Sequence, residues 1–273
     1  MNPTNNLKKK GIFLVFLIIS FYSSFSFTPP WSIGSYSNGL GNIRMHGKSS
    51  FSVYNLPSFM MDSTKWNIAL MYGNPYGVST LSETAISAKI NQKSVSLGAC
   101  YYQLGYSISS QRLISFSVGI SLNDKTSLGC SINGFQQRVE GFNSRNALAP
   151  TVAFSRKIAD NTHAHFLAFN PILNLSKHYL PNMYSAGLNW ITSSEVCVYL
   201  EVKSQLDKQT AISLGLEYSV RKQLTIVAGV QTYPRTLNFG FSIRQQKFKT
   251  TGSFQQSRNL GFSPMFNLEF ADK

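Results

Sequence analysis

The chain has 273 residues, enough for one large domain or two ordinary ones, and its formal net charge is +14. Charged residues make up only 13% of it, about half the usual share, whereas aromatic residues also reach 13%. Disordered chains are rich in charge and poor in aromatic residues, so the composition excludes disorder. It also disfavours a helical bundle, whose surface would draw on Glu, Lys, Ala and Arg. The composition is typical of a β-rich chain whose outer surface carries few charges.

The amino terminus has the residue order of a secretory signal peptide. Lys8 to Lys10 precede an apolar run over residues 12–19, and small residues follow up to Ser26. The run is too short for a comfortable membrane-spanning helix, which needs about 20 residues. We therefore expect cleavage after residue 26, with a retained anchor as the alternative. No later apolar run is long enough to be a spanning helix.

From Trp66 onward, apolar and polar residues alternate. In residues 114–122 the even positions are apolar and the odd positions are Ser or Gly. Residues 212–220 and 237–244 also alternate, with Glu217, Asn238 and Arg244 among their polar positions. Successive residues of a strand point to opposite faces, so each such segment has one apolar and one polar face. The segments are about as long as the 9–11 residues that a tilted transmembrane strand requires.

The connections between these segments also alternate. Every second one is a short polar turn, such as 123–125 or 159–161, and most of the others are longer, such as 138–146 and 172–182. Outer-membrane barrels combine short periplasmic turns, longer external loops and an even strand number. The alternative is a soluble β-sandwich, but its polar face would carry charges, whereas this face is mainly Ser, Gly, Asn and Gln. We predict an all-β fold, an antiparallel transmembrane β-barrel of about fourteen strands, near 66–73, 82–91, 94–104, 111–122, 126–137, 147–158, 162–171, 183–193, 195–206, 210–220, 223–233, 236–246, 247–257 and 261–270.

The segment ahead of the first strand does not alternate cleanly and is punctuated by Gly and Pro. It starts on the periplasmic side, so it can fold back into the lumen as an irregular plug; a periplasmic tail is the alternative. The predicted organisation is a signal peptide at 1–26, an N-terminal segment at 27–63 and a transmembrane barrel at 64–270.

Catalytic and cofactor chemistry is not expected. The chain has no GxSxG, HExxH or phosphate-binding loop pattern, and its acids are too scattered to nominate a catalytic pair. His163 and His165 share a strand face, but no third ligand can be assigned, so no metal site is predicted. Glu201, Lys203 and Glu217 fall on predicted lumenal faces. We expect them to pair there as filling of the interior, with an ion path as the alternative.

The net positive charge is consistent with an outer-membrane barrel. Many cationic residues lie in or beside the predicted outer loops, where the phosphates of lipopolysaccharide would attract them. The basic residues form no compact run or known motif, so a nucleic-acid partner is not expected. The cationic residues near the outer loops are Arg112, Arg138, Arg145, Lys177, Lys208, Arg235 and Arg258.

Short sequence blocks along the mature chain resemble the FadL/PorV-related outer-membrane proteins of Bacteroidota, particularly their small members. These blocks are residues 49–58, 74–81, 168–171 and, closest of all, 253–264 followed by 265–270. The resemblance implies a location in the bacterial outer membrane and a fourteen-stranded barrel whose amino-terminal segment occludes the lumen.

The same resemblance assigns roles to individual residues. It implies that Asn55, Pro57 and Phe59 anchor the plug. It also implies that the last strand, with Phe266, Leu268 and Phe270 on one face, is the signal read by the barrel-assembly machinery. Three residues, Ala271 to Lys273, follow Phe270 in this chain.

The family does not imply a single activity, because its members include fatty-acid importers and accessory barrels of type IX secretion. The leading prediction is a non-enzymatic, PorV-like component of envelope transport or secretion, with outer-membrane lipid and secretion-system partners. The alternatives are a FadL-type conduit for hydrophobic small molecules and a structural barrel or assembly partner without a substrate. A barrel lipase is the least favoured alternative, because the sequence shows no nucleophile–base set. A conduit needs a continuous apolar path, and the predicted lumen is lined with Ser, Gly and Asn. This predicted lining does not decide between the competing functions.

Overall fold

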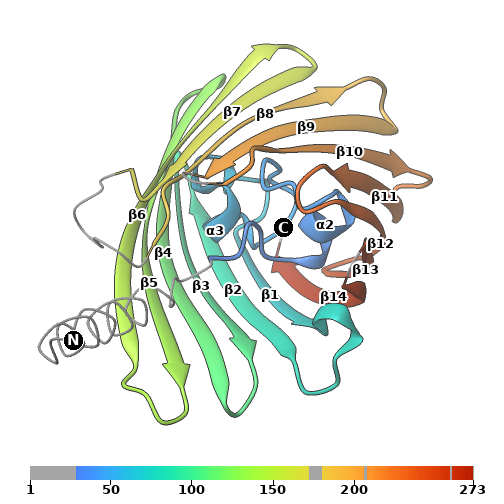
Figure 1. Cartoon of the computed structure of the whole chain (residues 1–273). Coiled ribbons are helices and arrows are strands. Elements are labelled where there is room, and N and C mark those ends of the chain that lie inside the picture. The colour runs from blue at the N-terminus through green and yellow to red at the C-terminus, as the bar shows by residue number, and fades with distance from the viewer. Residues whose placement is uncertain (1–28, 172–179, 206–207, 259, 273) are drawn as a thin grey trace, which may run out of the picture.

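The computed structural model describes residues 29–171, 180–205, 208–258 and 260–272, so the predicted signal peptide lies outside the described residues. Within them, fourteen antiparallel strands close into one barrel, each hydrogen-bonded to its neighbours in sequence (Figure 1). The predicted fold class and strand number are confirmed. The strands are β1 (Trp66–Gly73), β2 (Ser82–Gln92), β3 (Val95–Gly105), β4 (Ser109–Asn123), β5 (Thr126–Val139), β6 (Arg145–Ala159), β7 (Thr162–Phe169), β8 (Met183–Ile191), β9 (Val196–Gln205), β10 (Ala211–Ser219), β11 (Leu224–Gln231), β12 (Thr236–Gln245), β13 (Phe248–Ser257) and β14 (Gly261–Asp272).

The barrel closes where β1 pairs with β14. The register runs from Trp66 opposite Asp272 to Gly73 opposite Met265. Closure leaves no sheet edge whose backbone groups would be stranded in lipid. The last strand extends two residues beyond the predicted end at Phe270, because Ala271 and Asp272 are needed to pair with the first two residues of β1. The terminal aromatic residue is therefore not the last residue of the strand.

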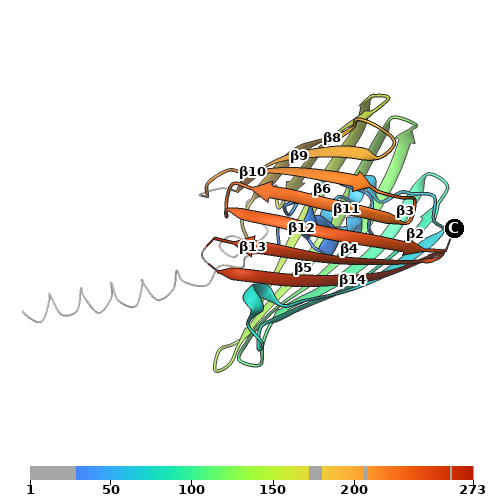
Figure 2. The same cartoon turned by 90° about the vertical axis from the view of Figure 1, so that its right-hand side faces the viewer.

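The two ends of the barrel differ, as Figure 2 shows in side view. At one end, here called the turn end, β2–β3, β4–β5, β6–β7 and β12–β13 are each joined by a two-residue turn, for example Asp124-Lys125. At the other, the loop end, the connections include residues 74–81 between β1 and β2, which contain the short helix η2 (Pro75–Gly77). The predicted alternation of short turns and longer loops is confirmed, and in barrels of this kind the short turns face the periplasm.

The outer wall of the barrel is apolar and the inner wall is polar or small. On β4, Phe116 faces outward with 59% of its surface exposed, whereas Ser115 and Ser117 face the lumen and are buried. The same alternation continues around the barrel, so the exposed apolar side chains form one band. A soluble β-sandwich would instead hide its apolar faces between two sheets. A continuous exposed apolar band is the surface that lipid covers in a membrane-spanning barrel. Among the described residues, no helix is long and apolar enough to cross a membrane.

Lysine substitutions should be tolerated on only one face of the wall. Leu214→Lys places a charge in the lipid-facing band, where Leu214 is 49% exposed, and should cost about 2–4 kcal/mol of folding free energy near the bilayer centre. Ser219→Lys lies on the same strand but borders a lumenal cavity, so it should assemble normally. The fraction of protein that shifts on an unheated gel measures assembly. Equal loss for both variants would contradict the assignment of faces.

Candidate functional site

The lumen is occupied by the N-terminal segment, residues 29–63. This segment contains two short helices, α2 (Ser35–Gly39) and α3 (Ser52–Asn55), and one turn of 3-10 helix, η1 (Pro57–Phe59). Helix α2 packs against β11–β14, α3 against β2–β4 and η1 against β4–β6 (Figure 1). Most of its side chains are buried, including Tyr36 and Tyr54. The segment thus crosses the interior of its own barrel and contacts the wall on both sides.

Glycines on the inner wall let the segment's backbone lie directly against the strands. A Cβ atom added to Gly129 of β5 would meet the carbonyl carbon of Pro57 at 2.2 Å, and one added to Gly229 of β11 would meet that of Leu40 at 2.2 Å. Contacts this short cannot accommodate any side chain. The Ser and Gly on the polar face of the strands therefore provide the space that the segment occupies.

The sequence-predicted plug residues lie at the centre of these contacts. The side-chain amide of Asn55 donates to the carbonyl oxygen of Ile33 at 2.8 Å, and its oxygen accepts from the amide of Ile33 at 2.9 Å. Asn55 therefore ties the two arms of the segment together. Pro57 is the first residue of η1, where its fixed φ suits a helix start. The ring of Phe59 packs against the rings of His163 and His165, with centroids 5.6 and 5.0 Å apart.

The two histidines of β7 are held by polar wall residues. His165 is within hydrogen-bond distance of the Ser155 hydroxyl at 2.8 Å and of the Asn189 side-chain amide at 2.9 Å. In the part of the chain that the structure describes, no group of three His, Cys, Asp or Glu side chains could hold a metal ion. The histidines therefore contribute to the seat of Phe59.

The predicted lumenal charges contact the segment as well as the wall. Glu201 accepts a hydrogen bond from the backbone amide of Arg44 at 2.7 Å and lies 4.0 Å from Lys203. Lys203 donates to the carbonyl oxygen of Asn42. Glu217 forms an ion pair with Lys48 and accepts hydrogen bonds from the hydroxyls of Tyr36 and Tyr199 at 2.6 and 2.7 Å. All three side chains are buried, so each depends on these partners.

Sequence reasoning missed a second ion pair that fastens the segment to the wall. Lys89 of β2 is fully buried and donates to Asp62 at 2.7 Å and to the carbonyl oxygen of Met60 at 2.7 Å. Burial alone would raise the pKa of Asp62, but the Lys89 ammonium and the Thr64 hydroxyl hold that pKa below its usual range. The signal was present in the sequence, since Lys89 lies at a lumen-facing position of a predicted strand.

Removing Lys89 should loosen the end of the segment. Lys89→Met keeps the length of the side chain but removes two charge-assisted hydrogen bonds, so it should lower the free energy of unfolding by about 1–3 kcal/mol. The measurement is the temperature at which the folded, fast-migrating gel band disappears. Lys157→Met is the matched control, because the Lys157–Asp160 ion pair is exposed and contributes little. An unchanged transition in Lys89→Met would contradict a fastening role.

A polar cavity of about 480 Å³ lies between the segment and the turn-end half of the wall from β10 to β14. Its lining includes Lys48, Arg244 and Lys249 together with Asp62, Glu217 and Glu269. Lys249 lies 3.6 Å from Glu269 and also donates to the carbonyl oxygen of Lys48. This half of the lumen is therefore lined mainly by charged and polar groups, which favour polar over apolar molecules.

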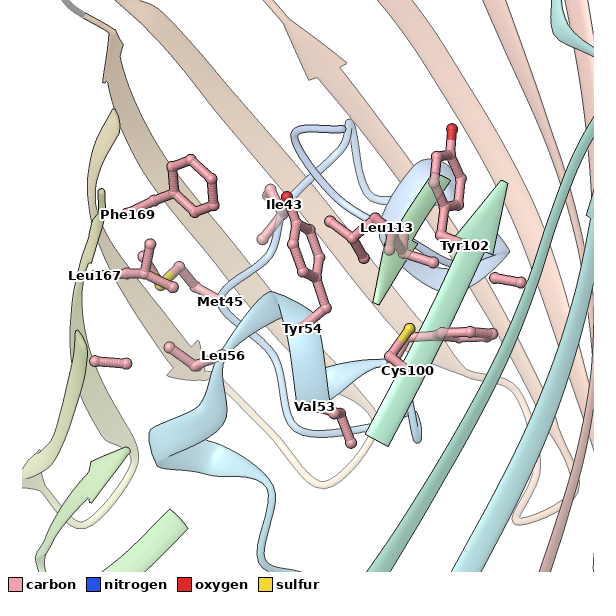
Figure 3. Close-up of a cluster of buried hydrophobic side chains, with 14 of the residues drawn as sticks. Ile43, Met45, Val53, Tyr54, Leu56, Cys100, Tyr102, Leu113, Leu167 and Phe169 are labelled. Atoms are coloured by element: carbon pink, nitrogen blue, oxygen red, sulfur yellow. The ribbon is translucent and has the colours of Figure 1, made fainter. Parts of the chain in front are cut away.

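The loop-end half of the lumen is different, because apolar side chains line it from β3 to β8. Phe135 and Phe169 meet edge to face with centroids 5.8 Å apart. They belong to one connected set of buried apolar side chains that joins the wall to the segment (Figure 3). We call this set the apolar cluster; its wall members include Tyr102, Leu113, Phe135, Leu167 and Phe169, and its segment members include Ile33, Ile43, Met45, Tyr54 and Leu56. The sequence predicted a lumen lined with Ser, Gly and Asn, and this half also carries apolar side chains that the prediction did not include.

The closed fourteen-stranded barrel has counterparts among solved structures. No family model and no curated protein matches the chain. The CymD monoaromatic hydrocarbon channel is similar, with a TM-score of 0.69 at 12% identity, over 90% of this chain and 99% of that one. The Pseudomonas putida toluene transporter TodX has a TM-score of 0.63 at 12% identity, over 90% and 98%. A Pseudomonas aeruginosa FadL homologue has a TM-score of 0.61 at 12% identity, over 91% and 99%. At these identities the likeness establishes the fold.

Proposed function

We propose that this protein is an outer-membrane conduit for small hydrophobic molecules. We also propose that a signal peptide directs the protein across the inner membrane and is then cleaved. The observation that carries the proposal is the apolar cluster, which gives the loop end of the lumen an aromatic and aliphatic lining inside an otherwise polar barrel. Ligand sites for small apolar molecules are concave, mostly hydrophobic and largely pre-formed. The cluster supplies the hydrophobic lining, and because its side chains pack against one another, a ligand would enter by displacing them. Its members Phe135 and Phe169 lie toward the end that faces outside in barrels with short periplasmic turns.

The segment determines which solutes the barrel admits. Its ion pairs and hydrogen bonds to β2, β9, β10 and β14 occupy the part of the lumen through which ions and sugars would pass. An apolar molecule can instead dissolve among side chains such as Phe135, Phe169 and Tyr54, which repack more readily than paired charges separate. The arrangement therefore selects hydrophobic over polar solutes.

The similar barrels support the conduit over the secretion-accessory prediction. CymD is described as a monoaromatic hydrocarbon channel, and TodX as a toluene transporter. We extend this substrate class to the present chain because its loop-end lumen has the aromatic lining that such molecules require. The PorV-like role, the Bacteroidota origin and a secretion-system partner depend on the sequence blocks alone.

Photolabelling tests this function in the purified, full-length protein. A small aromatic diazirine should label lumen-facing positions of β5 and β7, and excess toluene should displace that label but not the label on the outer wall. Phe135→Ser should weaken the displacement about tenfold, since it removes most of one buried aromatic side chain. Phe116→Ser is the matched control on the outer wall of the adjacent strand. Label confined to the outer wall would contradict the proposal.

A further inference from the structure

A second, separate concavity lies on the outer wall of the barrel. It is a groove of about 730 Å³ across β3, β4, β5 and β6, toward their loop ends. The cross-strand register identifies it as an outward-facing feature, because seven of its nine lining residues share the face of Phe116. The other two, Phe135 and Ala147, are their buried neighbours along β5 and β6. Its lining includes Tyr101, Arg112, Ile114, Gly134, Gln136 and Leu148.

The groove has an apolar floor and a polar rim, set by two adjacent rows of paired residues. The row nearer the bilayer centre runs Tyr101, Ile114, Gly134, Leu148, and the row nearer the loops runs Gln103, Arg112, Gln136, Asn146. Gly134 has no side chain, and the nearest atom to an added Cβ would be 3.6 Å away. The floor between Ile114 and Leu148 is therefore open to an aliphatic chain.

Arg112 is the charged group of the rim. Its Nε atom is buried and has no hydrogen-bond partner within the described ranges of the chain. A buried N–H donor without an acceptor is unfavourable, and the guanidinium carries a positive charge, so an anion is the ligand that would satisfy this group. The side-chain amides of Gln136 and Asn146 lie beside it, with Gln136 donating to Asn146 at 3.3 Å, and Arg138 follows on the same face of β5. Amides and guanidinium groups together suit a phosphorylated sugar.

We propose that this groove binds one acylated, phosphorylated glycolipid of the lipid A type. The phosphate pairs with Arg112, sugar hydroxyls bond to Gln136 and Asn146, and one acyl chain lies over Gly134 between Ile114 and Leu148. The proposal rests on the outer-membrane location proposed above, which places the loop end in the leaflet that contains such lipids. The row of side-chain amides favours a sugar headgroup over the glycerol phosphate of an ordinary phospholipid.

Native mass spectrometry of the full-length protein in detergent, titrated with diphosphoryl lipid A, tests the site. Arg112→Gln should weaken binding at least about tenfold through loss of a charge-assisted hydrogen bond. Gly134→Leu should weaken it similarly by filling the floor, and it leaves Arg112 in place. Arg156→Gln is the control, an exposed arginine on the outer face at the turn end of β6, and should bind lipid A as the unchanged protein does.

Three results would overturn the proposal. Unchanged lipid A binding in both groove variants would show that the groove is not the binding site. An equal loss of affinity in Arg156→Gln would show that lipid A is held by general charge attraction. Equal binding of phosphatidylglycerol, lost in the same variants, would replace the glycolipid with a phospholipid. The outcome is independent of conduit function, because toluene displacement in the photolabelling assay should be unchanged in Arg112→Gln.

Discussion

Deletion of residues 29–58 should convert a closed barrel into an open pore. Fourteen strands enclose a lumen much wider than that of an eight-stranded barrel, which side chains alone just fill. The N-terminal segment occupies that space, and irregular backbone is tolerated there because it faces protein and not lipid. In planar bilayers the intact protein should conduct ions poorly, and the deletion variant should show steady steps at least about tenfold larger.

The wall should survive this deletion. Strand pairing does not involve the segment, and the wall charges that lose partners, such as Glu217, would gain water from the opened lumen. A heat-dependent gel shift of the deletion variant is the control for assembly. An assembled variant that stays closed would show that wall side chains fill the lumen, and a large conductance from the intact protein would make it a general porin.

Gly129→Leu should expel the segment from its seat without any deletion. The contact of 2.2 Å between an added Cβ and Pro57 involves backbone on both sides, so no side-chain movement relieves it. Either η1 leaves the wall or the barrel fails to close around it, and the folded fraction should fall while the surviving barrels conduct ions. Conductance and the gel shift are measured together on the same preparation.

A matched control for this variant lies on the same strand. Gly134→Leu adds the same side chain to the outward face of β5, where an added Cβ meets nothing closer than 3.6 Å. It should assemble normally and remain closed. Normal assembly and closure in Gly129→Leu would contradict the account of how the segment is seated.

The strands could be predicted closely because one pattern specifies both their length and their faces. Each predicted boundary lies within two residues of the observed one. Alternation must persist across the whole lipid-covered wall, and it stops where polar turns such as Asp124-Lys125 begin. The path of residues 29–63 could not be predicted in the same way. Its helices span only three to five residues and are held by partners far away in sequence, such as Ser35 with Asn267.

The sequence did not predict the apolar cluster, because alternation is recognised only where apolar and polar residues follow one another along a strand. At Tyr101-Tyr102 and Leu113-Ile114, both faces of the strand are apolar, so the lumen-facing member is not distinguished from its lipid-facing neighbour. Strands buried on both faces read as near-continuous apolar runs. Such adjacent apolar pairs near the loop ends of β3 and β4 were the available signal for an apolar lumen.

Uptake by whole cells tests the central claim most directly. Cells with an intact outer membrane that produce this chain should take up labelled toluene faster than cells without it. Phe135→Ser, present at the same level of folded protein, should return the initial rate to background, and Phe116→Ser should leave it unchanged. Identical uptake with and without the folded chain would contradict its role as a conduit for small hydrophobic molecules.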